Sequence, residues 1–263
     1  MQYFRLLMIA IPFLLQSYLI KDSANTTTTN KPWVSLFNGK DLTHWKLKIA
    51  GYPLQENYGH TFRVADNMLS TRYNEYDSFN GRFGSIFYDK KFTNYRLRVE
   101  YRFVGDLTKG APVWGYKDGG IQYHCQAPET MGLNQAFPVC LEYNILGQKD
   151  SGEERATGEI CASGIYVEVN GKRNTSYCTP PTIKKSYTGD QWVTAEIDVR
   201  DGKITHFVNG EKVLEFQNPR YDSSHAEGIK FIKAGKDLVR DGYISLQSNS
   251  HPMDFRKIEI MEY

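Results

Sequence analysis

Two neighbouring segments of the sequence carry polar side chains whose types and spacing suit acid–base chemistry. Both segments, 120–126 and 139–146, have the composition of β-strands, and the loop between them contains two prolines and a glycine. Successive side chains of a strand point to opposite faces, so residues two apart share a face. The polar residues that share faces in this way are Gln122 with His124 and Glu142 with Asn144. If the two faces coincide, an imidazole, a carboxylate and two amides converge on one surface.

The composition favours a sugar as the ligand of such a surface. Aromatic residues make up 14% of the chain, and 18 of the residues are tyrosines. A tyrosine ring suits carbohydrate because its face is apolar and its hydroxyl forms hydrogen bonds, although aromatic residues also favour strands for structural reasons. The net charge of 263 residues is only +2, so we expect no nucleic-acid partner and no attraction to a membrane surface.

The first 24 residues (1–24) have the pattern of a signal peptide. Arg5 precedes an apolar run that is short for a membrane span and contains Pro12. Residues 25–32 are polar and rich in threonine, which is typical of a flexible tether. We therefore expect export to the periplasm or the extracellular space of a bacterium, with no stable membrane insertion after the signal is removed. An uncleaved signal anchor is the alternative.

Four cysteines allow three disulfide pairings in an exported protein. We predict a bond between Cys161 and Cys178, because these residues bracket a hairpin-like segment. A bond between Cys125 and Cys140 would close the loop between the two polar segments. Strict alternation places those two side chains on opposite faces, so that bond would need a β-bulge. No group of cysteines and histidines has the spacing of a zinc site.

The rest of the sequence predicts an all-β fold. Residues 92–104 alternate between apolar and charged side chains, which indicates a half-buried antiparallel strand. Short strands of this kind recur along the chain with Asn-Gly and Asp-Gly turns between them, and no long amphipathic helix follows the signal. The composition does not break within 33–263, so we predict a single domain there. Its expected form is a jelly-roll sandwich of two antiparallel sheets that binds its ligand in a concave face.

Four motifs occur in a characteristic order along this domain. They are WVSLFNGKDLTHW, then DGGIQYHCQAP with VCLEYNILG, then GDQWVTAEIDVRDGKITHFVNGEKV, and finally DGYISLQSNSHPMDFRKIEI. Together they resemble the family of 3-keto-disaccharide hydrolases over nearly all of 33–263. The central motif departs from the family pattern at three places, where this chain has Asp118-Gly119-Gly120, His124 and Asn144. The resemblance implies a concanavalin A-like jelly roll that acts on glycosides oxidised to a ketone at C3.

Such a substrate would be cleaved by acid–base chemistry. The ketone acidifies the proton at C2, a base removes that proton, and the group at C1 leaves by elimination before water adds back. We predict Glu142 as the base and His124 as the acid or the donor to the enolate oxygen. The residues predicted to bind the sugar are Gln122, Asn144, Gln247, His251 and Arg72. We expect no cofactor, with a divalent metal held by His124 and Glu142 as the alternative to a protein acid.

Two other classes of function fit parts of the sequence. An ordinary retaining β-glycosidase of this fold carries two carboxylates on one strand, and the segment EIDVRD at 196–201 approaches that pattern. A non-catalytic carbohydrate-binding module would use the same aromatic and amide-rich surface. The sequence contains neither the G-x-S-x-G motif of serine hydrolases nor a phosphate-binding loop.

Overall fold

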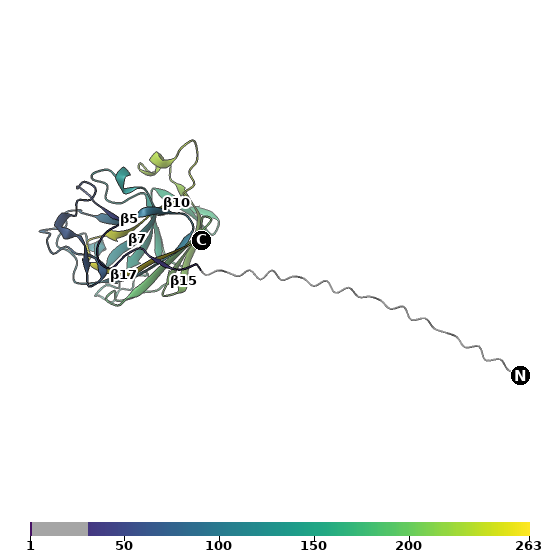
Figure 1. Cartoon of the computed structure of the whole chain (residues 1–263), viewed down its shortest axis with the longest axis horizontal. Helices are drawn as coiled ribbons and strands as arrows, with labels where there is room; N and C mark the ends of the chain where they lie inside the picture. The colour runs from purple at the N-terminus through teal and green to yellow at the C-terminus, as the bar shows by residue number, and fades with distance from the viewer. Residues whose placement is uncertain (2–30) are drawn as a thin grey trace. The chain divides into compact units, whose positions relative to one another are not determined.

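The computed structural model describes Met1 and residues 31–263. The predicted signal peptide and most of the predicted tether fall on residues 2–30, outside the described residues. Lys31–Tyr263 forms one compact unit built from two β-sheets (Figure 1), in which all the strand pairs are antiparallel. The predicted all-β sandwich of two antiparallel sheets is therefore confirmed.

One sheet has ten strands. In spatial order these are β11 (Lys172–Asn174), β10 (Ile165–Val169), β15 (Glu211–Tyr221), β14 (Lys203–Val208), β13 (Val193–Arg200), β6 (Tyr95–Phe103), β17 (Met253–Glu262), β4 (Met68–Thr71) and β3 (Phe62–Ala65), with β1 (Val34–Ser35) also paired to β17. The last strand of the chain therefore lies inside the sheet, between β6 and β4. Strands that are far apart in the sequence therefore lie side by side in this sheet.

The second sheet has seven strands. In spatial order these are β12 (Cys178–Thr179), β9 (Glu159–Ser163), β8 (Cys140–Leu146), β7 (Asp118–Cys125), β16 (Gly242–Ser248), β5 (Gly84–Phe92) and β2 (Trp45–Ile49). The helices in the described part are short 3₁₀ turns, η1 (Tyr58–His60), η2 (Val113–Gly115), η3 (Pro128–Thr130) and η4 (Gly228–Phe231). None of the helices among the described residues is long and apolar enough to cross a membrane.

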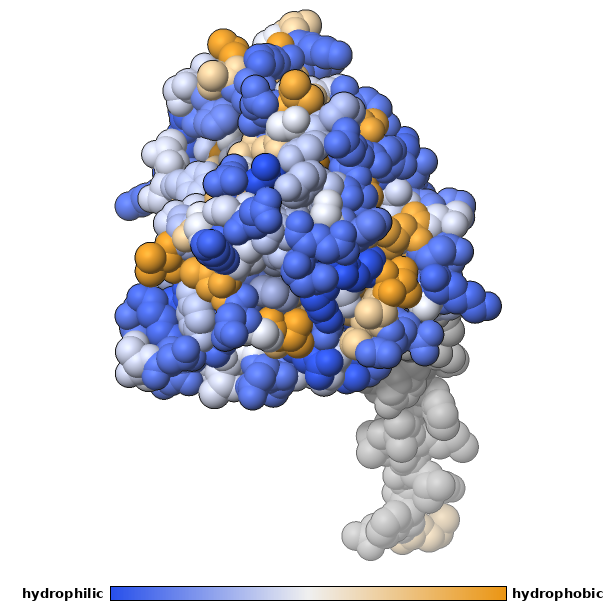
Figure 2. Space-filling model, turned by 90° about the vertical axis from the view of Figure 1, so that its left-hand side faces the viewer, coloured by the Kyte–Doolittle hydropathy of each residue, from blue (hydrophilic) through white to orange (hydrophobic). Residues whose placement is uncertain are grey.

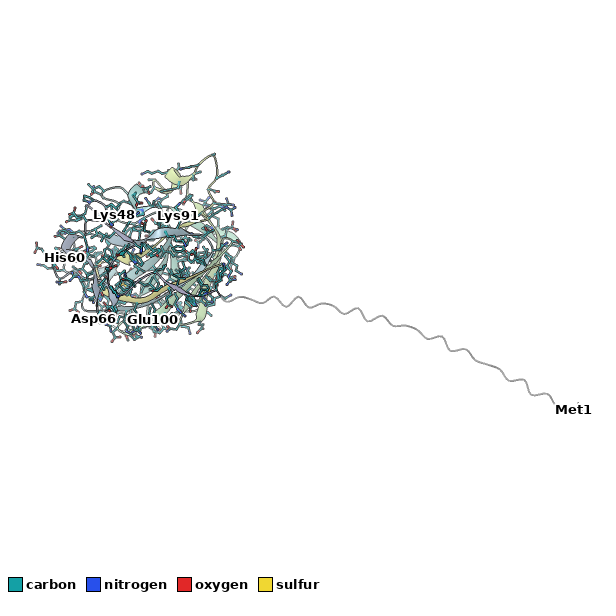
Figure 3. The ribbon with its side chains drawn as sticks, viewed as in Figure 1. Met1, Lys48, His60, Asp66, Lys91 and Glu100 are labelled. Atoms are coloured by element: carbon teal, nitrogen blue, oxygen red, sulfur yellow. A yellow bond between two sulfur atoms is a disulfide. The ribbon has the colours of Figure 1, made fainter. Side chains whose placement is uncertain are left out.

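The hydrophobic core lies between the two sheets, as the alternating pattern of residues 92–104 predicts. On β6, Leu97 and Val99 are buried, whereas Glu100 on the other face is partly exposed. Figure 3 shows Glu100 on the opposite side of the domain from Lys48 and Lys91, which belong to the seven-stranded sheet. The face of the domain in Figure 2 is mainly hydrophilic and carries small, separate apolar patches. Burial of one face of each sheet against the other is thus the main source of stability.

Candidate active site

The polar faces of β7 and β8 coincide on the outer side of the seven-stranded sheet. Gln122 lies opposite Glu142, and Gly120 lies opposite Asn144. The side chains of the inner face belong to the core, namely Ile121, Tyr123, Leu141, Tyr143 and Ile145. A cavity of about 590 Å³ opens over the polar face, and residues of β7, β8, β9 and β16 line it. The convergence of polar groups expected from strand alternation is therefore present, except that His124 is not part of it.

Two amides hold the carboxyl group of Glu142. Its Oε2 accepts hydrogen bonds from Nε2 of Gln122 at 3.0 Å and from Nε2 of Gln247 at 2.9 Å. The amide of Gln122 is oriented from behind, because its Oε1 accepts hydrogen bonds from Ser85 at 2.7 Å and from Ser245 at 2.8 Å. Gln122 is fully buried and does not line the cavity. Gln122 therefore positions Glu142 and does not reach the cavity, contrary to the prediction that it binds the sugar.

The missing side chain of Gly120 makes room for Glu142. A Cβ atom at position 120 would lie 2.5 Å from Cδ and 2.9 Å from Oε1 of Glu142. The carboxyl group therefore lies directly over Gly120. Asp118 shares this face of β7 and is two residues away, which corresponds to about 6.6 Å along a strand. The glycine thus brings the carboxyl groups of Glu142 and Asp118 near one another.

Three carboxylate–amide pairs make up the polar part of the cavity. Besides Glu142 with Gln247, Nδ2 of Asn249 donates to Asp118 at 2.7 Å and Nδ2 of Asn144 donates to Glu159 at 2.7 Å. In each pair the amide nitrogen faces the carboxylate, which leaves the amide oxygen turned away from it. The oxygens of Asn144, Gln247 and Asn249 have no hydrogen-bond partner within the described part of the chain. These three oxygens are buried, so the polar groups that line the cavity are the carboxylate–amide pairs as units.

Asp118, Glu159 and Asn249 are not among the site residues predicted from the sequence. Alternation along β7 could have placed Asp118 on the polar face, because it lies two residues before Gly120. Glu159 could not be found in this way, since its place beside Asn144 depends on the pairing of β8 with β9. Asn249 follows β16 and reaches Asp118 only because β16 lies next to β7.

The surroundings raise the pKa of both carboxyl groups near Gly120. Desolvation, and after it the charges of Asp118 and Glu159, raise the pKa of Glu142 to about 8, against the hydrogen bond from Gln122. Desolvation likewise raises the pKa of Asp118 to about 7, although Asn249 and Arg155 oppose the shift. Two neighbouring carboxyl groups that titrate near neutral pH can exchange protons with a substrate.

His124 does not join these groups, which corrects the prediction that it shares a face with Gln122. On β16, Tyr243 pairs with Cys125 and Ser245 pairs with Gln122, so β7 has one extra residue and forms a bulge. The bulge falls at His124, whose φ angle is 50°. It turns the imidazole to the inner side of the sheet, where the ring lies 6.4 Å from that of Tyr95. His124 therefore cannot act on a ligand bound beside Glu142.

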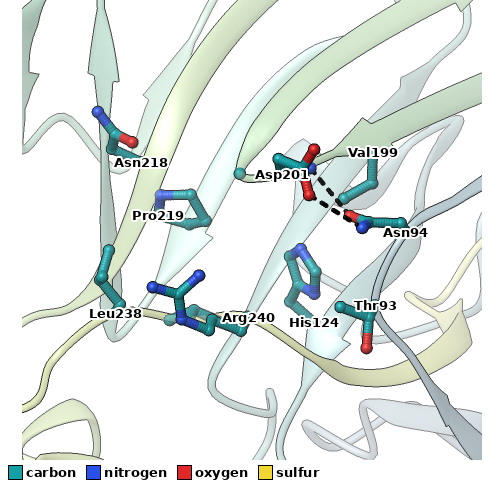
Figure 4. A pocket seen from close by; sticks show the side chains of 11 residues that line it. Thr93, Asn94, His124, Val199, Asp201, Asn218, Pro219, Leu238 and Arg240 are labelled. Carbon is teal, nitrogen blue, oxygen red and sulfur yellow. Dashed lines mark hydrogen bonds between the residues drawn. The ribbon is translucent and has the colours of Figure 1, made fainter.

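His124 instead lines a separate cavity of about 200 Å³, together with Asn94, Asp201 and Arg240 (Figure 4). Burial lowers the pKa of His124 to about 4, so its imidazole is neutral at neutral pH. The bulge also requires Gly242 on β16, because a Cβ atom there would lie 2.3 Å from the carbonyl carbon of His124. The proposed metal alternative fails on the same geometry, since His124 and Glu142 face different cavities.

The predicted disulfide between Cys161 and Cys178 is present. It joins β9 to β12 at the edge of the sheet and lines the cavity that contains Glu142. Sulfur and carboxylate atoms of Cys161, Cys178 and Glu159 lie within 4.8 Å of one another, but the disulfide removes the thiolates that a metal would need. Cys125 and Cys140 are buried free thiols in one small cluster, because the bulge at His124 places them on the same side.

Two other residues predicted to bind the sugar lie away from the cavity. The ring of His251 is buried and packs edge-on against Phe103 and Tyr116, with ring centroids 5.4 Å and 5.2 Å away. Arg72 forms an ion pair of 2.5 Å with the buried carboxylate of Asp254. Both residues therefore support the fold. The sequence carried no information on which way their side chains turn.

The carboxylates of the segment 196–201 also lie elsewhere. Glu196 pairs with Arg96 at 2.9 Å and Asp198 pairs with Arg200 at 2.9 Å, on the outer face of the ten-stranded sheet. Neither residue lines the cavity with Glu142. Both carboxylates are paired with arginines away from the cavity, so the retaining-glycosidase alternative loses the residues on which it rested.

The fold and the site define a carbohydrate-active protein with a jelly-roll sandwich. The model of the 3-keto-alpha-glucoside-1,2-lyase-like domain matches residues 32–261, which is nearly the whole described unit. The chain belongs to this family, and the resemblance seen in the four sequence motifs is confirmed. A comparison with curated proteins finds no match.

Solved structures share the fold at low sequence identity. Two proteins of Parabacteroides distasonis, both provisionally assigned as glycosyl hydrolases, are 19% and 16% identical, with TM-scores of 0.53 and 0.54. The alignments cover 88% and 89% of this chain and 94% and 100% of those chains. The exoplasmic/lumenal domain of VIP36, in its Ca²⁺/Man3GlcNAc-bound form, is 10% identical with a TM-score of 0.51, and 87% of each chain is covered.

Proposed function

We propose that the protein cleaves 3-keto-glycosides, with Glu142 as the base that removes the C2 proton. The observation that carries this proposal is the position of the Glu142 carboxyl group, which two amides hold over Gly120 beside a second carboxyl group. The three carboxylate–amide pairs that line the cavity support a polyhydroxylated substrate. The family supports a ketone at C3. The disulfide fits an exported protein, so we also propose action outside the cytoplasm.

The reaction proceeds in two bond-breaking steps. Glu142 takes the proton from C2, and the electron pair of that bond forms an enolate with the C3 carbonyl. The enolate then re-forms the carbonyl, a double bond forms between C1 and C2, and the C1–O bond breaks. Asp118 donates a proton to the departing oxygen. Water adds across the new double bond to yield the free 3-keto sugar, so the net reaction is hydrolysis, and solvent restores the protons of the two carboxyl groups.

Arg155 contributes positive charge at the wall of the cavity. Its guanidinium donates to the backbone carbonyls of Gly147 at 2.8 Å, of Lys117 at 3.0 Å and of Tyr116. These contacts fix the charge near Asp118 before substrate binds. Fixed charge is effective in stabilising an enolate because it needs no reorganisation during the reaction.

Comparison of oxidised and unoxidised substrates tests the proposal. We expect the protein to release the leaving group from a 3-keto-glucoside and to leave the matching plain glucoside intact. The ketone is required because it alone acidifies the proton at C2. Release from the plain glucoside would overturn the proposal in favour of an ordinary glycosidase. Binding of both compounds without release from either would favour a non-catalytic carbohydrate-binding module.

The pH profile should be bell-shaped, with its maximum between about pH 7 and 8. At lower pH both Glu142 and Asp118 are protonated and no base is available, whereas at higher pH both are ionised and no acid is available. Because the pKa of Glu142 is the higher of the two, the productive form, with Glu142 ionised and Asp118 protonated, is the less populated of the two singly protonated forms. The quantity to measure is kcat/KM for the keto-glucoside as a function of pH. In Asp118→Asn the alkaline limb should flatten, and the acid limb should move to higher pH, because the first proton lost is then that of Glu142 and no longer that of Asp118, whose pKa is the lower of the two. If the profile of Asp118→Asn lost its acid limb instead, Asp118 would be the base and Glu142 the acid.

A further inference from the structure

Cys125 and Cys140 are two free thiols that lie side by side on the seven-stranded sheet. Both are buried, and Met131 packs against the small cluster that they form. Neither thiol takes part in the proposed reaction. An exported protein meets oxidising conditions, and Cys161 and Cys178 of the same sheet are already joined. The second pair of cysteines therefore lies where a further disulfide would be chemically favoured.

The bulge of β7 makes these two cysteines neighbours across the strands. Between the backbone pairs that flank the bulge, β7 contributes His124 and Cys125, whereas β8 contributes only Cys140. The side chain of His124 points to the inner side of the sheet, so Cys125 faces Cys140 on the outer side. The existing disulfide joins residues in the same relation, because Cys161 and Cys178 are direct partners of β9 and β12.

A row of hydrogen bonds connects Cys125 to the proposed base. Oγ of Ser245 lies 3.6 Å from Sγ of Cys125 and donates its one proton to Oε1 of Gln122 at 2.8 Å. The thiol of Cys125 must therefore be the donor to Ser245. Gln122 in turn donates from Nε2 to the carboxyl group of Glu142 at 3.0 Å. A change at the sulfur of Cys125 thus reaches Glu142 through two side chains.

We infer that Cys125 and Cys140 are a redox-active pair, which a small organic disulfide RSSR oxidises to a second disulfide bond that weakens the support of Glu142. One thiol loses its proton and attacks a sulfur of RSSR, which releases RS⁻ and leaves a mixed disulfide. The second thiol loses its proton and attacks the protein sulfur of the mixed disulfide, which releases the other RS⁻. The two protons end on the two RS⁻ groups. The cysteines lose two electrons, and the S–S bond of RSSR gains them.

The buried thiols react when the segment between their strands opens. The exposed fractions of Cys125 and Cys140 are 2% and 1%, and burial, together with the thiol of Cys125, raises the pKa of Cys140 well above its usual range. Most of the connecting residues 127–137 are exposed or half-buried, so opening of this segment uncovers the pair without disrupting the core. We therefore expect oxidation over hours and not over seconds.

Formation of the bond removes the donor to Ser245. Cys125 no longer carries a hydrogen, and its sulfur moves toward Cys140, because bonded sulfurs lie only about 2 Å apart. The hydroxyl of Ser245 is then held by Gln122 alone, and the amide of Gln122 loses part of the support that directs it to Glu142. We expect lower activity in the oxidised protein. This part of the inference rests on the proposed function, whereas formation of the bond does not.

Mass spectrometry of the protein after incubation with oxidised glutathione tests the bond itself. The protein is prepared without reductant, so that the disulfide between Cys161 and Cys178 stays intact. We expect the mass to fall by that of two hydrogen atoms and the peptide map to link Cys125 to Cys140. The melting temperature should rise by roughly 5 °C, because the bond closes a loop. Two unchanged thiols after a day, or a glutathione adduct that does not resolve, would overturn the inference.

Two variants test the connection to the base, with kcat/KM for a 3-keto-glucoside as the readout. Cys140→Ala keeps the Cys125 donor, so it should retain the activity of the reduced wild type and be unaffected by oxidised glutathione. Cys125→Ala lacks the donor and should lose about two- to tenfold without any oxidant, the range for one hydrogen bond. The oxidised wild type should show a similar loss, which serves as the readout if Cys125→Ala does not fold.

Full activity of the oxidised wild type would overturn the inference, because the bond would then have no effect on Glu142. A loss of activity in Cys140→Ala on addition of oxidised glutathione would also overturn it, since that variant cannot form the bond. A wild-type protein that turns over no 3-keto-glucoside would overturn the proposed function. The redox-active pair would survive that result, because the mass and the peptide map do not depend on turnover.

Discussion

Replacing Glu142 by glutamine should lower kcat/KM for a 3-keto-glucoside by about 10²–10⁴-fold, the usual contribution of a general base. The amide cannot accept the C2 proton, but it has the shape of the carboxyl group and still accepts hydrogen bonds from Gln122 and Gln247. The measurement is release of the leaving group at pH 7.5, about midway between the two raised pKa values. A fully active Glu142→Gln protein would reject Glu142 as the base.

The stability of the same variant shows whether the fold is intact. Folding raises the pKa of Glu142 from 4.5 to about 8, so the folded protein disfavours the ionised form. This carboxyl group therefore lowers the free energy of unfolding as pH rises from its ordinary pKa toward about 8. We expect the melting temperature of Glu142→Gln at pH 8 to equal or exceed that of the wild type. Glu259→Gln, which removes a carboxylate paired with Arg98 on the other sheet, should retain full activity.

Replacing Gly120 by alanine should lower kcat/KM by about 10²-fold, because a small displacement of a reacting group is enough to have this effect. The new methyl group would occupy space within 2.5–2.9 Å of three Glu142 side-chain atoms, so the carboxyl group must move. Gly120 does not have a positive φ angle, and alanine is therefore compatible with the backbone. The kinetic loss should appear together with a small change in melting temperature.

Gly119→Ala separates the effect on the site from an effect on the strand. Position 119 faces the other way, and its new methyl group would lie 2.4 Å from the sulfur of Met253 in the core. We expect this variant to lose thermal stability and to retain most of its kcat/KM. If Gly119→Ala and Gly120→Ala lost activity equally, the space over Gly120 would not be the cause.

Much of the fold could be read from sequence because each sheet buries one face. Burial forces alternation, so the strand over 92–104 and the pairing of the segments with Gln122 and Glu142 were both predictable. The disulfide between Cys161 and Cys178 was predictable for a similar reason, since a short hairpin-like segment limits the partners of its ends. The local sequence pattern is sufficient to predict a residue's environment wherever that environment depends only on the residue's own strand.

The corrections arise where the environment depends on a neighbouring strand. The sequence pattern places His124 on the same face as Gln122, but a bulge opposite β16 directs its side chain to the inner side of the sheet. The same bulge brings Cys125 to the side of Cys140. The guanidinium of Arg72 could donate hydrogen bonds to a sugar, but it is paired with the buried carboxylate of Asp254 on β17. The local sequence pattern does not show where a strand has an extra residue relative to its neighbour, or which charge lies on a strand far away in the sequence.

By itself, the sequence determined an all-β sandwich, its family, and a polar surface on which Glu142 is the central carboxyl group. Only the tertiary structure decided which groups accompany Glu142. In the structure, Asp118 lies beside Glu142 where His124 was predicted, and Glu159 and Asn249 belong to the same cavity. Gln122 holds Glu142 in place and does not contact the ligand. The physical reason is that alternation specifies the face of a side chain, whereas partners across strands depend on register, bulges and the space that a residue such as Gly120 leaves open.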